Sequence, residues 1–516
     1  AEADAALRAA ERAADAADVV IVGAGPAGLA AALRVKQKRD DLRVVVLEKA
    51  AEVGAHVLSG AVIEVDALDE VAPGWRDDGP LRTEVKAAHF YYALSGGTWL
   101  PAPEPPAVRN KATNRIGSLS QLCRYLGERA EAAGVEVFAG FAASELVLNE
   151  RRDALLGVAT SDVGVGKDGA LTANFERGME LRAPVTLLAE GCRGSLTTRA
   201  ERVFGLREAA GAQHQTYGIG LKEVWRVAAD KHDEGRVEHV FGWPVTNDVW
   251  GGAFVYHWGG DERLVSLGYV VGLDYTNPYL NPYRTFQQFK TADRMRALLD
   301  GGECIAYGAR ALNEGGLQSL PRLAFRGGAL LGCGAGMLNV PKVKGTHNAL
   351  KSGIMAGDAV CDALDAAAGS VADADDPVAA AAARTATLDA YQARFDASDV
   401  RAELHAVRNV RPAAHTPLGT AGMAVYAAVD SWLLRGRAPW TFKHHAKADH
   451  ETLLPAAQCK RIEYPPPDGK LTFDLLTNLA RAGTNHEEDQ PPHLRVQDHA
   501  KPIAESLAVH DGPEAR

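Results

Sequence analysis

Cysteine is scarce in this chain, and no two cysteines are spaced as a pair. The six cysteines are scattered over 516 residues and form no C-x-x-C motif. This pattern argues against a disulfide framework and a zinc site, and it is typical of a reducing compartment. The chain also lacks any run of roughly 18 apolar residues, so the sequence predicts no membrane-spanning helix.

An excess of positive charge is missing as well. The net charge is −10 and the pI is about 5.9, which argues against a nucleic-acid binder. The hydrophobic and charged fractions are 47% and 24%, as in ordinary globular proteins. The length is sufficient for two or three domains.

The most informative stretch that is present is a glycine-rich turn near the start of the chain. Residues 18–29 read DVVIVGAGPAGL, which predicts a buried parallel strand followed by the glycine spacing of a dinucleotide fingerprint. The helix that begins near Pro26 directs its N-terminal amides at a pyrophosphate. Residues 44–49 form a second strand, whose final glutamate can accept hydrogen bonds from a ribose. The predicted contacts are Gly23, Gly25, Pro26, Ala27, Gly28, Glu48 and Lys49.

A second glycine-rich stretch fits the same motif, but its flanking residues differ. Residues 164–169 read GVGKDG and also fit G-x-G-x-x-G. Polar residues precede them, a Lys-Asp-Gly turn signal lies inside them, and no apolar helical stripe follows. We therefore interpret this stretch as a hairpin loop. The chain has no other credible copy, so a built-in NAD(P)H domain is not expected.

Two later stretches complete the predicted nucleotide site. Residues 185–195 form an apolar strand that runs into Glu-Gly, and residues 328–336 form another that ends in small residues before an apolar helix. This order resembles the FAD-dependent fold of the glutathione reductase and hydroxylase class. The resemblance implies a helix N-terminus that faces the flavin and stabilises negative charge on it. Further cofactor contacts implied in this way are Ser59, Gly60, Glu190, Gly191, Gly332, Asn339, Gly345 and Thr346.

A set of longer segments is similar to one family, the electron transfer flavoprotein–ubiquinone oxidoreductases. The likeness runs from about Val19 to the last residue. The segments are GAHVLSGA (54–61), QTYGIGLKE (215–223), GLDYTNPY (272–279), AYGARALNEGG (306–316), VPKVKGTH (340–347), VRNVRP (407–412), IEYPPPDG (462–469) and GTNHEEDQ (483–490).

The resemblance implies an electron-transferring-flavoprotein dehydrogenase. Electrons would arrive from reduced electron transfer flavoprotein, pass through FAD and a 4Fe-4S cluster, and leave to ubiquinone at a membrane surface. Because electron transfer needs close cofactors and no nucleophile, we assign no catalytic acid–base residue and no metal ligand. The expected partners are electron transfer flavoprotein, ubiquinone and a membrane, without nucleic acid. The expected location is peripheral, on the cytoplasmic membrane of a bacterium or the mitochondrial inner membrane.

The same resemblance implies a quinone site and a membrane contact. The family's Tyr-Gly-Gly matches Trp250, Gly251 and Gly252, whose glycines allow close approach by a planar ring. Residues 418–447 form an apolar helix with aromatic residues and a basic edge, a pattern that suits the bilayer interface. A second membrane segment of the family matches residues 57–75.

The predicted fold class is α/β with α+β insertions. A discontinuous FAD-binding domain of the glutathione reductase type would comprise residues 1–80, 112–212 and 325–370. A β-rich quinone-binding domain would comprise 81–111 and 213–324, and residues 371–516 would form a C-terminal region with the membrane-interface helix. We expect the family's cluster cysteines beyond Arg516, because no four cysteines here suit a cluster.

Two other functions fit parts of the sequence. A flavin-dependent reductase of isoprenoid lipids, of the geranylgeranyl type, would share the fold and the membrane contact, but the segments after residue 400 argue against it. A non-catalytic flavin-binding scaffold or remnant would share the nucleotide site without turnover. Quinone reduction by the FAD-loaded protein distinguishes all three.

Overall fold

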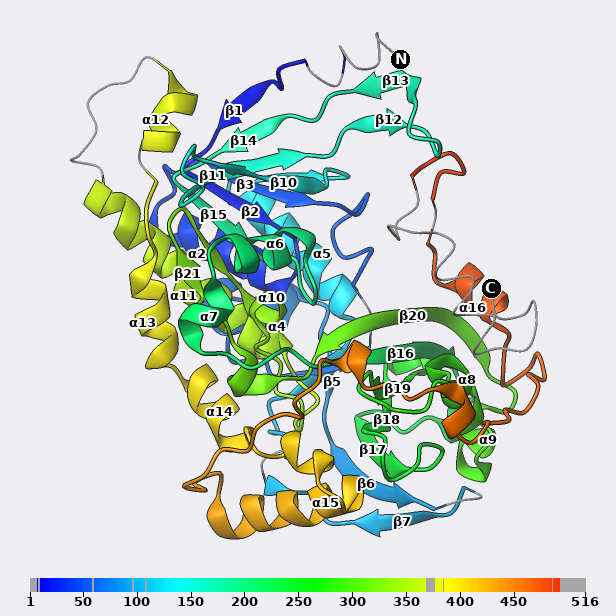
Figure 1. Cartoon of the computed structure of the whole chain (residues 1–516). Coiled ribbons are helices and arrows are strands. Elements are labelled where there is room, and N and C mark those ends of the chain that lie inside the picture. The colour runs from blue at the N-terminus through cyan, green and yellow to red at the C-terminus, as the bar shows by residue number, and fades with distance from the viewer. Residues whose placement is uncertain are drawn as a thin grey trace.

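Two large sheets organise the chain in the computed structural model (Figure 1). The structure describes residue 7 and residues 10–57, 60–94, 97–106, 109–367, 376–383, 385–484 and 486–491. One sheet has six strands and the other has seven. Both belong to a mixed α/β fold with a largely parallel sheet and a β-rich second part, as predicted.

The six-stranded sheet is almost entirely parallel. Its order is β21 (Ala324–Phe325), β22 (Gly328–Leu330), β15 (Val185–Leu188), β2 (Val19–Val22), β3 (Val44–Glu48) and β9 (Glu136–Ala139). Only β21 and β22 pair antiparallel. The central strands are buried along their apolar length, because helices pack on the sheet and β11 (Leu155–Thr160) of a smaller sheet contacts β15.

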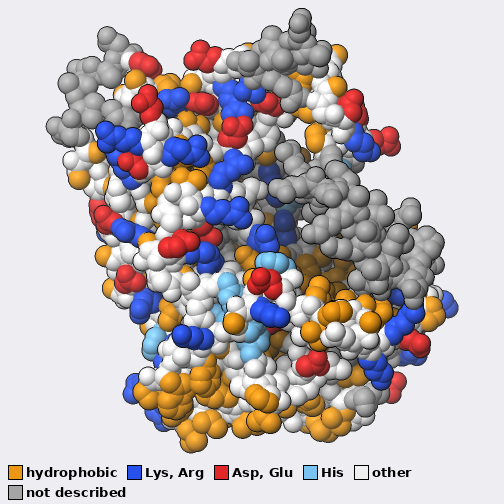
Figure 2. Space-filling model, viewed as in Figure 1, with side chains coloured by type: hydrophobic (Ala, Val, Ile, Leu, Met, Phe, Trp, Pro, Cys, Tyr) orange, Lys and Arg blue, Asp and Glu red, His pale blue; other side chains and the backbone are white. Residues whose placement is uncertain are grey.

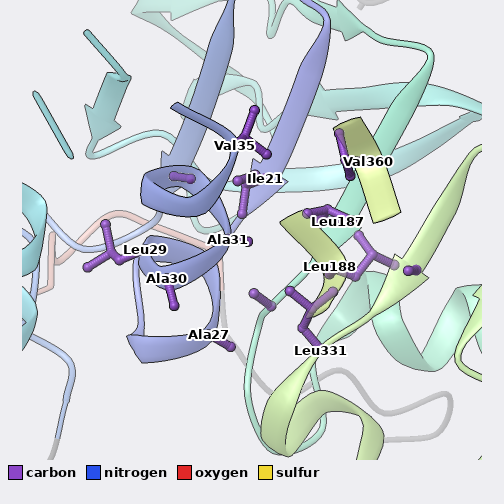
Figure 3. Packing of buried hydrophobic residues seen from close by; sticks show 14 of the residues in the cluster. Ile21, Ala27, Leu29, Ala30, Ala31, Val35, Leu187, Leu188, Leu331 and Val360 are labelled. Atoms are coloured by element: carbon purple, nitrogen blue, oxygen red, sulfur yellow. The ribbon is translucent and has the colours of Figure 1, made fainter. Parts of the chain in front are cut away.

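Three helices pack on this sheet: α2 (Pro26–Lys38), α5 (Leu119–Ala132) and α11 (Thr346–Ala367). Small residues let α2 and α11 approach closely, since a Cβ at Gly353 would overlap the carbonyl oxygen of Ala27. Arg34 of α2 also pairs with Asp358 of α11 at 2.7 Å. Figure 3 shows the alanines of α2 packed near Ile21 of β2 and Leu187 of β15. The start of α2 is therefore held firmly against the strand ends.

Three smaller sheets surround this core. The first orders β1 (Ala14–Ala16), β14 (Glu180–Arg182), β11 (Leu155–Thr160) and β10 (Ala143–Leu148). The second pairs β12 (Val163–Val165) antiparallel with β13 (Leu171–Glu176), so the hairpin prediction for residues 164–169 is confirmed. The third orders β4 (Ala61–Ile63), β8 (Arg115–Gly117) and β5 (Thr83–Glu84).

The seven-stranded sheet forms the second half of the molecule. Its order is β20 (Glu303–Asn313), β16 (Tyr217–Arg226), β19 (Leu264–Gly272), β18 (Gly251–Trp258), β17 (Arg236–Gly242), β6 (Ala87–Ala93) and β7 (Trp99–Ala102). Neighbouring strands are antiparallel except for the parallel pair of β17 and β6. Aromatic side chains fill the core beneath it, where α8 (Pro282–Phe289) and α9 (Asp293–Leu299) contribute Phe286, Phe289 and Met295.

Short helices and a helical tail complete the chain. The short ones are α3 (Leu68–Val71), α4 (Trp75–Asp78), α6 (Ser195–Val203), α7 (Leu206–Ala210) and α10 (Gly332–Ala335). The tail contains α12 (Pro377–Ala383), α13 (Asp389–Asp396), α14 (Asp399–Val407), the turn η5 (Pro412–His415), α15 (Gly419–Val429), the wide turn η6 (Asp430–Leu434) and α16 (Leu475–Arg481).

Candidate functional site

A cavity of about 1830 Å³ lies at the carboxyl ends of the parallel strands, where the two large sheets meet. Ligands of open α/β sheets bind at this edge, and the volume exceeds that of ordinary small-molecule sites, which hold roughly 300–1,000 Å³. The wall includes ten residues that the sequence predicted as cofactor contacts. They are Gly23, Gly25, Pro26, Ala27, Glu48, Lys49, Glu190, Gly191, Gly345 and Thr346.

Each of the three fingerprint positions requires glycine for a different structural reason. Gly23 has φ +106° and a Cβ there would lie 2.6 Å from the carbonyl oxygen of Ala189. At Gly28 a Cβ would overlap the carbonyl oxygen of Gly23, so this position lets α2 approach β2. At Gly25 a Cβ would meet nothing within 4 Å and would point into the cavity. The cradle that a pyrophosphate needs is therefore open at Gly25, beside the N-terminus of α2.

Glu48 holds the same turn and faces the cavity. Its Oε2 accepts a hydrogen bond from the amide of Ala24 at 3.0 Å, and its Oε1 accepts one from Ala50 at 2.8 Å. A carboxylate has about four acceptor positions, so Glu48 can also accept from ribose hydroxyls. Glu48 lines the cavity, and its contact with a ribose stays a prediction.

The opposite wall comes from the seven-stranded sheet, and sequence reasoning did not find it. Lys222 of β16 and Arg310 and Asn313 of β20 line the cavity there. The Oδ1 atom of Asn313 is buried and has no hydrogen-bond partner within the described chain. Thr346, the first residue of α11, also lines the cavity. A ring with amide and carbonyl groups, such as the flavin, fits this polar end.

Five predicted cofactor contacts lie elsewhere or are not described. Gly28 and Gly60 lie behind the wall, and the amide of Gly332 donates to the Ser352 hydroxyl at 3.0 Å. Asn339 donates to Glu403 at 2.8 Å, also behind the wall. Ser59 lies outside the described residues. The four described residues of this set therefore lie next to the cavity wall and do not line the cavity.

Glu190 lines the cavity but its carboxylate caps a helix. Its Oε2 accepts from the amide and hydroxyl of Thr197 at 2.6 and 2.8 Å, and its Oε1 accepts from the amide of Leu196 at 3.2 Å. A Cβ at Gly194 would lie 2.5 Å from this side chain. Glu190 therefore fixes the start of α6 next to the cavity.

An ion cluster supports the turn before α11. Glu403 accepts from His347 Nε2 at 3.0 Å and from Lys342 Nζ at 3.2 Å, and Lys342 also pairs with Glu64. Burial acts to raise the pKa of Glu403, but the His347 hydrogen bond and the Lys342 charge outweigh it and hold that pKa well below the usual range. Glu64, His347 and Glu403 are spaced as metal ligands could be. Lys342 pairs with both carboxylates and Lys111 pairs with Glu64 at 3.1 Å, so a structural ion cluster explains the geometry.

The predicted quinone residues lie where β18 begins. A Cβ at Gly251 would lie 2.6 Å from the Val270 carbonyl oxygen, and one at Gly252 would lie 2.9 Å from that of Val240. The register through both glycines is regular. Close strand packing therefore requires glycine at both positions. Trp250 precedes them, with the Arg411 guanidinium 5.1 Å from its ring centre.

One buried cation under Trp250 serves two carboxylates. Arg411 pairs with Asp274 at 2.8 Å and with Glu314 at 3.2 Å. Burial and the nearby negative charge of Asp274 outweigh the Arg411 charge at Glu314 and raise its pKa to about 7. Asp274, His415 and His445 are also spaced as metal ligands could be. The guanidinium already lies against Asp274 and 3.2 Å from His415, which disfavours a second cation.

An apolar surface lies on α15 and η6. Leu418 is 70% exposed and Leu433 is 75% exposed, and Val425 and Trp432 are exposed beside them. Figure 2 shows apolar side chains gathered at the lower edge of the molecule, where α15 lies in Figure 1. Arg435, Arg437, Lys443 and Lys447 are exposed after the helix, whereas His444 is buried.

The strands β6 and β7 extend this surface, which sequence reasoning missed. Tyr92, Leu94 and Leu100 are exposed there, and the hairpin lies beside α15 along the same edge in Figure 1. The expectation of a second membrane segment at residues 57–75 was wrong: Leu68 and Trp75 belong to the hydrophobic core. Among the helices in the described ranges, none combines the length and apolarity that crossing a membrane requires.

The loop before Trp250 joins the predicted quinone residues to this apolar surface. Asn247 Oδ1 accepts from the amide of Ala421 at 2.7 Å, and its Nδ2 donates to the Leu418 carbonyl at 3.0 Å. Trp250 packs in one hydrophobic cluster with Met423 and Tyr426 of α15. Residues 247–252 and the start of α15 thus form one structural unit.

Family models match three parts of the chain. The ETF-QO, ubiquinone-binding model matches residues 217–312, and the NAD(P)-binding Rossmann-like domain model matches 21–82. A third, the electron transfer flavoprotein-ubiquinone oxidoreductase 4Fe-4S model, matches 469–516. This match begins inside the chain, upstream of the position where we expected the module, and none of its residues here is a cysteine.

Curated relatives are similar over nearly the whole chain. The mitochondrial electron transfer flavoprotein-ubiquinone oxidoreductases of Rattus norvegicus and Homo sapiens are 48% and 47% identical over 98% of this chain and 81% of their own length. A probable mitochondrial counterpart from Saccharomyces cerevisiae is 46% identical over 98% of this chain and 82% of its own.

Solved structures support the fold alone. A geranylgeranyl bacteriochlorophyll reductase-like protein from Thermoplasma acidophilum aligns with a TM-score of 0.54 at 16% identity, covering 82% of this chain and 98% of its own. A flavin-dependent brominase aligns with a TM-score of 0.50 at 14% identity, covering 85% and 97%.

Proposed function

Because the chain belongs to the electron transfer flavoprotein–ubiquinone oxidoreductase family, we propose that it passes electrons from reduced electron transfer flavoprotein to ubiquinone at a membrane surface. It is an oxidoreductase, an electron-transferring-flavoprotein dehydrogenase, and its partners are the flavoprotein donor and the quinone. The relatives' names and the ubiquinone-binding match carry this assignment, and the cavity and the apolar surface agree with it.

FAD is the cofactor of this cavity. We propose that Gly25 and the α2 N-terminus hold its pyrophosphate, that Glu48 holds its ribose, and that Asn313 and Thr346 face its ring. When bound, FAD accepts electrons and releases them to a second acceptor. The protein residues exclude water, orient the ring and compensate its charge.

The family's second cofactor is a 4Fe-4S cluster. Such clusters are held by cysteine thiolates, four in the standard case. The residues that match the cluster domain, 469–516, contain none, and the last cysteine of the chain is Cys459. No ligand for the cluster is therefore assigned in this chain, and no step is derived through it.

One observation carries the proposed quinone site. The loop that ends in Trp250, Gly251 and Gly252 is hydrogen-bonded through Asn247 to the start of the apolar helix α15. A quinone has a polar ring and an isoprenoid tail, so its site must connect the flavin to the lipid phase. We propose that the ring lies against the backbone of Gly251 and Gly252 and that the tail leaves along α15.

The apolar surface of α15, η6 and the β6–β7 strands provides the contact with lipid. The protein is peripheral on its membrane, which is the mitochondrial inner membrane or the cytoplasmic membrane of a bacterium. We propose the division of the chain into an FAD-binding part (1–80, 112–212, 325–370), a quinone-binding part (81–111, 213–324) and a C-terminal part (371–516). The two large sheets support the first two parts.

Steady-state quinone reduction tests the function. The protein as its gene encodes it is loaded with FAD and supplied with reduced electron transfer flavoprotein and a short-tail ubiquinone. We expect quinol formation that depends on both substrates. Bound FAD without quinol formation would contradict the proposal and favour a non-catalytic scaffold. Reduction of an isoprenoid double bond instead would favour the lipid reductase, whose likeness here is one of fold alone.

A further inference from the structure

One half-buried cation in the cavity has no anionic partner within the described residues. Lys222 lies in the middle of β16, and its side chain lines the cavity. Its Nζ donates to the carbonyl oxygen of Gly60 at 2.6 Å and lies 5.2 Å from the ring centre of Phe254. Within the described chain, no carboxylate forms an ion pair with it, and burial is the sole cause that lowers its pKa, to about 7.

The strand pairing leaves this lysine uncovered on the cavity side. Its partners across the sheet are Gly268 on β19 and Gly308 on β20. Neither partner has a side chain that could shield the ammonium. An ammonium has three N–H donors, and the Gly60 carbonyl accepts from one of them. Two donors therefore remain for a group bound in the cavity.

A fully buried lysine in the same half of the molecule shows what a structural role requires. Lys290 is fully buried, and its Nζ lies 2.9 Å from both carboxylate oxygens of Glu223. That pair satisfies the charge inside the protein. Lys222 has only a backbone carbonyl, so folding alone does not explain a charge placed there. A titratable group that lines a cavity without a charged partner is typical of a functional position.

We propose that the Lys222 ammonium contacts the flavin ring and compensates the negative charge that the ring gains when it accepts electrons. The proposal rests on the FAD assignment given under the proposed function. Lys222 and Asn313 line the cavity from the seven-stranded sheet, whereas the Gly25 turn belongs to the six-stranded sheet. A cation at that place favours the reduced cofactor over the oxidised one. Lys222 thereby raises the flavin midpoint potential, and it transfers no atom.

The test is a spectroscopic redox titration of the purified, FAD-loaded protein. Lys222→Met removes the charge at nearly constant length, and Lys222→Arg keeps it. We expect Lys222→Met to lower the ratio of fully reduced to oxidised flavin at least tenfold at a fixed potential, which equals a shift of about 30 mV in the two-electron midpoint potential. Lys222→Arg is expected to stay within about twofold of the unchanged protein.

A matched control lies on the surface of the same half. Lys231 Nζ also donates to a backbone carbonyl, that of Asp300, at 2.6 Å, but it lies outside the cavity. Lys231→Met should leave the potential unchanged. If Lys222→Met does not retain FAD, Lys222→Gln replaces it, because the amide can still donate to Gly60. The same tenfold shift is then expected.

A potential that stays unchanged in Lys222→Met or Lys222→Gln, with FAD bound, would overturn the inference. The titration needs neither electron donor nor quinone. Absence of FAD from the unchanged protein would instead contradict the proposed function. If the Lys222 variants shift the flavin potential as expected but the unchanged protein reduces no quinone, the proposed function is contradicted and the inference about Lys222 stands.

Discussion

The cavity and the proposed quinone loop use glycine for different purposes. At Gly25 a side chain would meet open space, so the ligand is what requires a glycine there. At Gly251 and Gly252 a side chain would meet the carbonyls of neighbouring strands, so the protein itself requires them. The comparison separates a glycine that a ligand demands from glycines that the sheet demands. A substitution at Gly25 should therefore change ligand binding without changing stability, whereas a substitution at Gly251 or Gly252 should change both.

The largest effect is expected at Gly25. Gly25→Val should abolish FAD incorporation, because the side chain would occupy the space of the pyrophosphate while contacting no protein atom nearby. The protein should stay folded and colourless. Flavin absorbance and circular dichroism of the purified variant measure both properties. A yellow, fully loaded Gly25→Val protein would contradict the assignment of this turn.

Gly28 provides the matched control in the same turn. A Cβ at this position overlaps the carbonyl oxygen of Gly23, so Gly28→Ala should lower the free energy of unfolding by about 1–3 kcal/mol. Thermal unfolding of the apoprotein detects this loss. If the apoprotein of Gly25→Val loses as much stability as Gly28→Ala, the two glycines do not differ in the proposed way.

The next effect concerns the apolar surface. Replacing Trp432, Leu433 and Leu434 with Ser should abolish flotation with liposomes, because apolar area gives monotopic helices most of their affinity for lipid. Leu475 and Leu476 of α16 are exposed apolar residues outside this surface, and Leu476 is 75% exposed, as is Leu433. Serine at both α16 positions serves as the control. Flotation that survives the first set, or is lost in the control, would disprove the membrane assignment of η6.

A smaller effect is expected at the quinone loop. Gly251→Ala and Gly252→Ala should slow quinone reduction roughly tenfold and cost about 1–3 kcal/mol of stability, since each Cβ presses on a neighbouring strand. Reduction of ferricyanide, which takes up no proton and needs no ring site, should be retained. Equal losses with both acceptors would mean that these glycines are structural only.

The smallest effect is a difference in pH dependence between the two ion clusters. The pKa of Glu403, near the cavity, lies below its ordinary value of 4.5, so its contribution to stability is complete above that value and is lost as the pH falls below it. The pKa of Glu314, near the quinone loop, is raised to about 7. Its contribution is complete below about pH 4.5 and is lost as the pH rises through 7.

Glutamine variants separate these two contributions. Glu403→Gln should flatten the fall of the free energy of unfolding on the acid side. Glu314→Gln should flatten its fall between pH 5 and pH 8. Each change should amount to roughly 1–3 kcal/mol. Thermal unfolding across the pH range measures both slopes. A variant that flattens the opposite limb would contradict the pKa direction given for that residue.

The sequence predicted the cavity's first wall well because its information is local. The turn at Gly23–Gly28 and the strand end at Glu48 lie within one βαβ unit, where spacing alone fixes geometry. Lys222 and Asn313 come from strands far along the chain, and only the pairing of β16 with β20 places them on the opposite wall. No periodicity in the sequence indicates such a meeting of two sheets.

Burial and partner choice were the other limits of sequence reasoning. Trp75 and its neighbours resemble a membrane segment in sequence, yet packing against the core buries them. Glu190 follows a strand as a cofactor contact would, but its carboxylate caps α6. The hairpin of residues 164–169 was predicted correctly because its turn residues are contiguous. Tertiary contacts therefore determine the burial of Trp75 and the partners of Glu190, which the local sequence pattern does not specify.

Reoxidation of the flavin by quinone tests the central claim most directly. The FAD-loaded protein is reduced chemically without its donor and mixed with a short-tail ubiquinone in a stopped-flow instrument, and the return of flavin absorbance is recorded. The account predicts reoxidation that accelerates with quinone concentration and slows roughly tenfold in Gly252→Ala. Flavin that stays reduced in the presence of quinone would contradict it.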